Sequence, residues 1–110
     1  MAKGDFVGEF ELYVLLALVH LGDDAYGVTI RREIEGRTKR EVAIGAVYAT
    51  LARLEEKGLV RFRVSEPQPI QGGRARKHVL LTAAGERALR HATSMLARMM
   101  AGWSPERGGS

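Results

Sequence analysis

Apolar residues recur at helical spacing along most of this 110-residue chain. A first helix is predicted over about residues 8–21, and apolar side chains cover most of its circumference. A helix that is apolar on all sides is buried on more than one of them. In so small a protein we expect one side to contact a partner chain, through Phe10, Leu12 and Leu16.

Two further helices follow, separated by a polar connector. The second is predicted over about residues 25–37, with Asp23 or Asp24 as its N-cap. The third is predicted over about residues 44–57, because apolar residues recur there as the single stripe of a half-buried helix. That stripe consists of Ile44, Val47, Leu51 and Leu54.

The opposite face of the third helix lacks the Glu and Lys residues that usually cover a solvent-exposed face. It carries small residues with one aromatic ring and one cation: Gly45, Ala46, Tyr48, Ala49, Ala52 and Arg53. A face without bulky side chains lets a helix approach another surface closely. A core helix with an alanine-rich surface has the same pattern, so periodicity alone leaves both interpretations open.

Two β-rich segments, residues 59–64 and 77–82, flank a loop that contains two prolines and Gly72-Gly73. Short strands on either side of a Gly-rich tip predict a β-hairpin. The order helix, helix, helix, hairpin is typical of a winged helix-turn-helix. We therefore expect a mainly α (α+β) fold in which residues 1–82 form the winged helix-turn-helix domain.

A last helix is predicted over residues 83–103, with Thr82 as its N-cap, before a tail at residues 104–110 whose composition predicts disorder. Its apolar positions form a heptad-like seam, which predicts pairing with another helix. The seam consists of Leu89, Ala92, Leu96, Met99 and Trp103. We expect a homodimer joined through this seam and the first helix.

Charge is unevenly distributed along the chain, and its distribution bears on which partner the protein binds. Residues 1–36 carry a net charge of −4 and residues 78–110 carry +2, whereas residues 37–77 carry +6. The positive segment contains the third helix and the tip of the hairpin. A basic face of this kind binds nucleic acid or is simply solvated, and charge alone does not decide between the two.

The major groove of duplex DNA admits one α-helix, whose N-terminal residues reach the base edges. In that position Ala46 and Ala49 would touch thymine methyl groups, and Tyr48 and Arg53 would contact phosphates. Basic residues of the connector and the wing would contact the DNA backbone or enter a minor groove. These residues are Lys39, Arg40, Arg74, Arg76 and Lys77.

Three stretches of the chain together resemble the PadR family of bacterial transcriptional regulators, over about residues 8–90. They read GEFELYVLLALVHLGDDAYGVTIRREIE, VAIGAVYATLARLEEKGLV and GGRARKHVLLTAAGERAL. The resemblance implies a winged helix-turn-helix homodimer joined through its terminal helices, with the compact subfamily's single C-terminal helix. It also implies repression, often relieved by a small phenolic or drug-like molecule. Family members commonly have Ser or Thr where Ala43 begins the reading helix, so a DNA contact at Ala43 lacks that hydroxyl.

Composition argues against catalysis and against secretion. The chain has no cysteine, which excludes disulfides, thiolate metal sites and cysteine nucleophiles. His20, His78 and His91 lack the spacing of metal ligands, so neither a metal, a cofactor nor an enzyme is expected. The acidic N-terminus differs from a secretory signal, and the longest apolar run falls short of the roughly 20 residues that span a bilayer. We therefore expect a cytoplasmic protein without membrane contact.

Two questions stay open from the sequence. A winged-helix module that binds protein rather than DNA would have the same basic face without base-edge contacts. Met95, Met99 and Trp103 either pack the dimer interface or form a pocket for a small aromatic effector. The second interpretation rests on the adaptable shape of methionine and on stacking between indole rings and flat ligands.

Overall fold

The computed structural model describes residues 7–64 and 77–105. Along the chain the elements are α1 (Glu9–Leu21), a 3₁₀ turn (Gly22–Asp24), α2 (Gly27–Thr38), α3 (Ile44–Glu56), β1 (Val60–Val64), β2 (Lys77–Leu81) and α4 (Ala83–Met100). The described part of the chain is therefore mainly helical, with one two-stranded antiparallel sheet.

The helices form one body because each has an apolar face that another helix covers. α1 packs against α2, α3 and α4, and its residues Val14 and Leu15 are fully buried. The predicted stripe of α3 is confirmed, since Val47, Leu51 and Leu54 are buried. Ile44, at the start of that stripe, is half-buried. Burial of this stripe leaves the opposite face of α3 at the surface.

The hairpin pairs β1 with β2, and Phe62 lies opposite Val79 in the antiparallel register. The N–H of Val79 also donates a hydrogen bond of 2.9 Å to the carbonyl of Ala25. The extended residue before α2 therefore lies beside β2 and attaches the wing to the helical body.

The expected N-cap of α2 at Asp23 or Asp24 is wrong. Both residues belong to the 3₁₀ turn, and Ala25 after them is extended. Tyr26 is the N-cap instead, and its N–H donates to Thr29 Oγ1 at 3.0 Å. The helix starts later than predicted because the backbone next to β2 must be extended to make its hydrogen bond.

Thr82 begins α4 as predicted: its Oγ1 accepts the N–H of Gly85 at 2.9 Å and donates to the carbonyl of Gly58 at 2.7 Å. A Cβ added at Gly85 would lie only 2.0 Å from the carbonyl oxygen of Leu59. This close approach explains why glycine occupies the position at which a capping box has Glu or Gln.

α4 ends at Met100, before the predicted end at Trp103. Gly102 has a φ of 87°, which takes the chain out of the helix. Trp103 therefore follows α4 instead of continuing its apolar seam. Residues 106–110 of the predicted tail lie outside the described residues.

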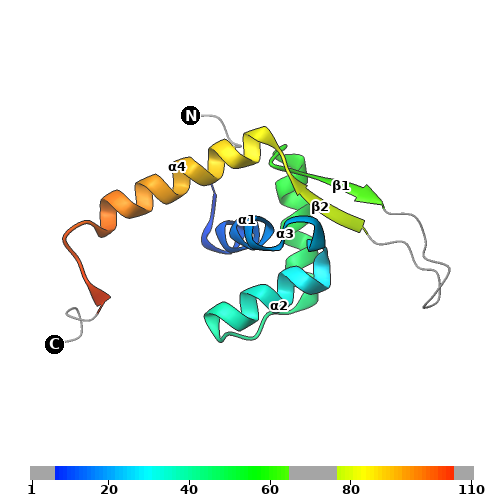
Figure 1. Cartoon of the computed structure of the whole chain (residues 1–110), viewed down its shortest axis with the longest axis horizontal. Coiled ribbons are helices and arrows are strands. Elements are labelled where there is room, and N and C mark those ends of the chain that lie inside the picture. The colour runs from blue at the N-terminus through cyan, green and yellow to red at the C-terminus, as the bar shows by residue number, and fades with distance from the viewer. Residues whose placement is uncertain (1–6, 65–76, 106–110) are drawn as a thin grey trace.

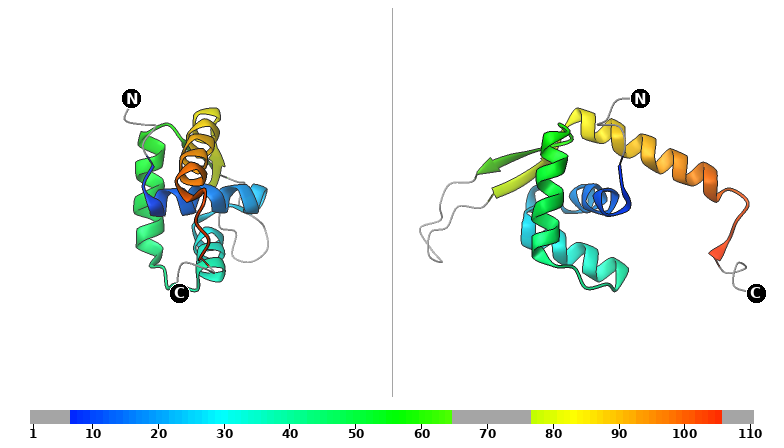
Figure 2. Two further views of the ribbon diagram at one scale, coloured as in Figure 1. Left: turned by 90° about the vertical axis from the view of Figure 1, so that its left-hand side faces the viewer. Right: turned by 180° about the vertical axis from the view of Figure 1, so that it is seen from behind.

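α4 and the hairpin leave the helical body on opposite sides (Figure 1). The first turns of α4 pack on the body, where Gly85, Ala88 and Leu89 are buried. The rest of α4 projects beyond α1 and α2, as the view from behind shows (Figure 2). Within residues 7–64 and 77–105, no helix has the length and apolar character needed to cross a membrane.

Candidate nucleic-acid interface

The exposed face of α3 carries little side-chain bulk. Its small residues Gly45, Ala46, Ala49 and Ala52 are all exposed. Tyr48 is 53 % exposed, and Arg53 continues this face toward the C-terminal end of the helix. Ala43 is the exposed N-cap of α3 and makes no side-chain capping bond. The sequence-predicted residues of α3 therefore share one surface.

Tyr48 is positioned by a glycine on the neighbouring helix. A Cβ added at Gly27 would lie 2.5 Å from the Tyr48 hydroxyl oxygen, so the phenol ring lies directly against the first turn of α2. A side chain at Gly27 would force the ring to move. The hydroxyl of Tyr48 consequently lies between α3 and the start of α2.

A groove of about 470 Å³ lies between α3, the start of α2 and the hairpin. Tyr48 and Glu55 of α3 line it together with Lys77 of β2. The ammonium of Lys77 lies 4.4 Å from the centroid of the Phe62 ring, a cation–π contact that orients the side chain. Lys77 and Tyr48, predicted as separate DNA contacts, thus line one groove. The predicted wing residues Arg74 and Arg76 lie outside the described residues.

The connector between α2 and α3 is exposed but anchored. Val42 N–H donates to Glu35 Oε2 at 3.0 Å, which attaches the connector to α2. Lys39 is exposed and ends α2 in a left-handed conformation. Arg40 Nη1 lies 3.9 Å from Glu9 Oε1, and both side chains are exposed. An ion pair this exposed is weak, so Arg40 can exchange Glu9 for another anion.

Glu11 is a buried carboxylate that the sequence analysis did not single out. Although only 7 % exposed, it accepts the N–H of Gly8 at 2.9 Å and Lys57 Nζ at 2.9 Å on each carboxylate oxygen. Arg53 Nε lies 3.8 Å from Glu11 Oε2. The only hint in the sequence is one acid inside an otherwise apolar helical run.

The surroundings of Glu11 favour its charged form. Burial alone would raise the pKa of this carboxyl, but the Gly8 hydrogen bond and the positive charges of Lys57 and Arg53 outweigh burial and lower the pKa below its ordinary value. α1 is therefore linked to the C-terminal end of α3 by a charged, buried contact.

Comparison with known protein families identifies this arrangement. The sequence profile of the transcriptional regulator PadR-like family matches residues 15–91. The chain belongs to this family. PadR-like proteins are winged-helix transcription regulators, so the chain is a DNA-binding regulator of a generally non-enzymatic family. A comparison with curated proteins by sequence finds no match.

Solved structures confirm the winged-helix fold of this PadR-like chain. A PadR-like transcription factor from Bacteroides fragilis matches with a TM-score of 0.67 at 24% identity, over 82% of this chain and 82% of that one. RosR from H. salinarum matches with a TM-score of 0.63 at 25% identity, over 93% and 84% of the two chains. F93 from STIV, a winged-helix DNA-binding protein, matches with a TM-score of 0.64 at 19% identity, over 83% and 90%.

The residues predicted for a dimer interface fall into two groups. Leu89 is only 8 % exposed and belongs to the core of its own chain, which removes it from an outward-facing seam. Phe10, Leu12, Leu16 and Ala92 are half-buried. Leu96, Met99 and Trp103 are exposed by 50 %, 83 % and 55 %, although Trp103 no longer lies on the helix.

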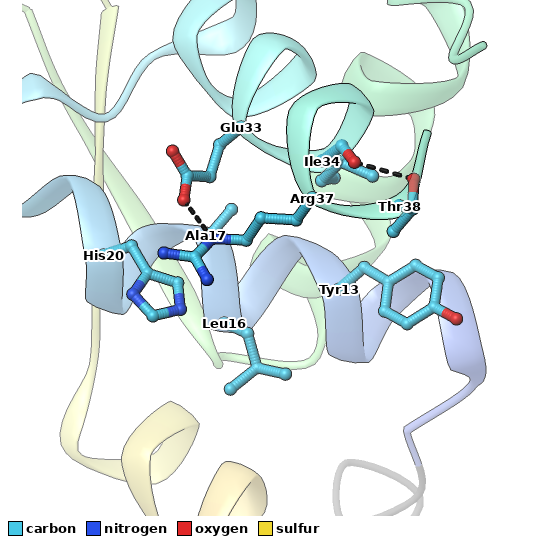
Figure 3. Close-up of a pocket in the computed structure, with 8 residues that line it drawn as sticks. All are labelled: Tyr13, Leu16, Ala17, His20, Glu33, Ile34, Arg37 and Thr38. Carbon is cyan, nitrogen blue, oxygen red and sulfur yellow. Dashed lines mark hydrogen bonds and ion pairs between the residues drawn. The ribbon is translucent and has the colours of Figure 1, made fainter. Parts of the chain in front are cut away.

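A second pocket, of about 230 Å³, lies between α1 and α2 (Figure 3). Leu16 and Ala17 of α1 and Ile34 of α2 provide its apolar lining. Arg37 Nε pairs with Glu33 Oε2 at 2.5 Å across its rim. The pocket extends the apolar surface around Leu16. Among the described residues, no cluster of three or more His, Asp or Glu is arranged to bind a metal.

Proposed function

We propose that this chain is a cytoplasmic repressor that binds a palindromic operator as a homodimer. The observation that carries the proposal is the N-terminal part of the exposed face of α3, where Tyr48 is the one large side chain among Gly45, Ala46 and Ala49. Such a face lets the helix backbone approach the floor of the major groove, which is about 12 Å wide. Ala46 and Ala49 then contact base edges, including thymine methyl groups.

The residues that flank the exposed face of α3 contact the DNA backbone. Tyr48 and Lys77 line one groove beside α3 together with Glu55, and we assign a phosphate contact to the ammonium of Lys77 and the hydroxyl of Tyr48 at the side of the groove away from that carboxylate. Backbone contacts add affinity with little sequence information. We assign them to Lys39, Arg40, Tyr48, Arg53, Arg74, Arg76 and Lys77.

A second copy covers the exposed apolar residues of α4. Met95, Leu96, Met99 and Met100 are each more than one third exposed along one short stretch. Exposed apolar side chains gathered in this way are typical of an interaction surface. We assign to the same interface Phe10, Leu12 and Leu16 of α1, which are half-buried against the core of their own chain. A two-fold dimer places two reading helices on one duplex, and its operator is then palindromic.

An effector site lies at the same interface. Met95, Met99 and Trp103 present a flexible thioether surface and an indole ring near the end of α4. A small aromatic molecule stacked there would change the spacing of the two reading helices and relieve repression. Saturable quenching of the single tryptophan, together with a loss of DNA affinity, is the expected result of titration with planar aromatics.

A gel shift tests the central claim. The duplex that precedes the protein's own gene is compared with a random duplex of the same length at one salt concentration. We expect at least about a thousandfold preference for the operator-containing duplex. If eight phosphates are neutralised, the logarithm of affinity falls with the logarithm of salt at a slope of about −7. Equal and shallowly salt-dependent binding of both duplexes would instead favour a protein-binding module.

A further inference from the structure

Arg53 is the one basic side chain on α3, and it is engaged within its own chain. It shares a helix face with Ala46 and Ala49, since these positions are three and four residues apart. Its Nη2 donates to Thr50 Oγ1 at 3.0 Å, and its Nε lies 3.8 Å from Glu11 Oε2. The guanidinium is therefore held toward α1.

The anion that holds Arg53 is fixed in place. Glu11 is buried, and its carboxylate is anchored by Lys57 Nζ and by the N–H of Gly8. A carboxylate with these partners cannot follow Arg53 if the guanidinium turns toward a ligand. Arg53 itself remains about half exposed, so a second anion can reach it from solvent.

We propose that Glu11 restrains DNA binding by competing with a DNA phosphate for Arg53. This inference rests on the proposed binding of duplex DNA by the α3 face. Glu11 is a positioning residue in this scheme, because it acts on DNA only through Arg53. Arg53 must weaken its contact with Glu11 to neutralise a phosphate, so it adds less to affinity while Glu11 is charged than it would without this competition.

The test compares wild type, Glu11→Gln, Arg53→Gln and the double variant on one fixed duplex. Glutamine keeps the size of Glu11 and an acceptor for Gly8, but it loses the charge that attracts Arg53. Affinity is measured by fluorescence anisotropy over a series of salt concentrations. We expect Glu11→Gln to bind roughly two- to fivefold more tightly, the scale of one partly exposed ion pair. We also expect its salt slope to steepen by about 0.9 per subunit, the value for one additional phosphate contact.

The double variant decides whether Arg53 carries the effect. We expect Arg53→Gln to remove the additional slope in the Glu11→Gln background and to lower the wild-type slope by less than it lowers the slope of Glu11→Gln. If the salt slope of the double variant is still steeper than that of Arg53→Gln alone, another cation makes the additional phosphate contact and the inference is wrong. Glu56→Gln is the matched control, because it removes a negative charge from exposed Glu56 near the same end of α3.

The remaining outcomes separate this inference from the function on which it rests. A thermal melt of each variant confirms that the binding species is folded at the assay temperature. If the wild type binds with steep salt dependence but Glu11→Gln leaves its slope unchanged, the restraint by Glu11 is wrong and the DNA-binding proposal stands. If the wild type shows no salt-dependent binding to any duplex, both are wrong.

Discussion

α3 and α4 both present an exposed face, and the two faces differ in bulk. Small residues prevail on the N-terminal part of the α3 face, whereas Met95, Leu96, Met99 and Met100 project from the second half of α4. Large apolar side chains gain about 25 cal/mol for each Å² that leaves water, so the face of α4 favours an apolar partner. A face of glycine and alanine gains little from burial and instead permits close approach. This difference in side-chain size supports the proposal that α4 binds a second chain and that α3 binds DNA.

Leu96→Glu should have the largest effect, because it places a charge at the centre of the α4 face. An unpaired charge buried at the proposed dimer interface would cost about 3–5 kcal/mol. We expect the wild type to sediment as a dimer at micromolar concentration and Leu96→Glu to sediment as a monomer. Ser94→Glu is the control, since it adds the same charge at another exposed position of α4. A wild type that sediments as one chain would contradict the dimer.

Ala49→Leu should have the next largest effect, because it gives the α3 face the bulk of the α4 face. Leucine is a good helix former, so the fold should remain intact. The side chain should hold α3 away from the groove and weaken operator binding by about a hundredfold, equivalent to about 2.7 kcal/mol. Ala49→Ser, which stays small, should bind within a few-fold of wild type. An Ala49→Leu protein with wild-type affinity and preference would mean that another face reads DNA.

Local pattern predicts the buried stripe of α3 and the start of α4, because helical periodicity and capping are properties of neighbouring residues. The buried stripe of α3 and the Thr82 cap of α4 both follow from spacing alone. The end of α4 was mispredicted because apolar spacing continues through Trp103 while Gly102 turns the backbone away. The burial of Leu89 in its own chain was also missed, since a seam pattern does not tell which chain covers it.

Contacts between distant segments were not predictable from periodicity. Glu11 and Lys57 are 46 residues apart, and the sequence shows neither that they meet nor that the carboxylate is buried. The same holds for Gly27 and Tyr48, which meet only because α2 packs beside α3. In the sequence, Gly27 is only a weak helix former at the start of a helix, and nothing there indicates that the Tyr48 ring covers it.

Gly27→Ala should have a smaller effect and tests how Tyr48 contributes to the α3 face. The added Cβ would lie 2.5 Å from the hydroxyl oxygen, so the ring must turn away into solvent. Because a half-exposed ring can move, we expect the fold to lose only about 1 kcal/mol in urea denaturation, the low end for overpacking. DNA affinity should fall by up to about tenfold, or 1.4 kcal/mol. In a Tyr48→Ala background, Gly27→Ala should have no further effect on affinity, and an equal loss in both backgrounds would contradict a role for the ring.

The smallest expected effect concerns Glu11 on α1, the helix that packs against both α3 and α4. The pKa of Glu11 is lowered in the folded state, because its hydrogen bond from Gly8 and the charges of Lys57 and Arg53 outweigh the opposing effect of burial. The stabilisation from this carboxylate is therefore complete above the ordinary pKa of 4.5 and is lost as pH falls through the lower folded-state value. Urea denaturation of wild type and Glu11→Gln at several pH values should show a stability difference that shrinks below about pH 4.5. The same comparison is repeated without DNA in the monomeric Leu96→Glu background. The stability difference should again shrink at low pH, because the contact joins α1 to α3 within one chain. A difference that disappears in the Leu96→Glu background would mean that α4 pairing, rather than the fold of one subunit, sets the environment of Glu11.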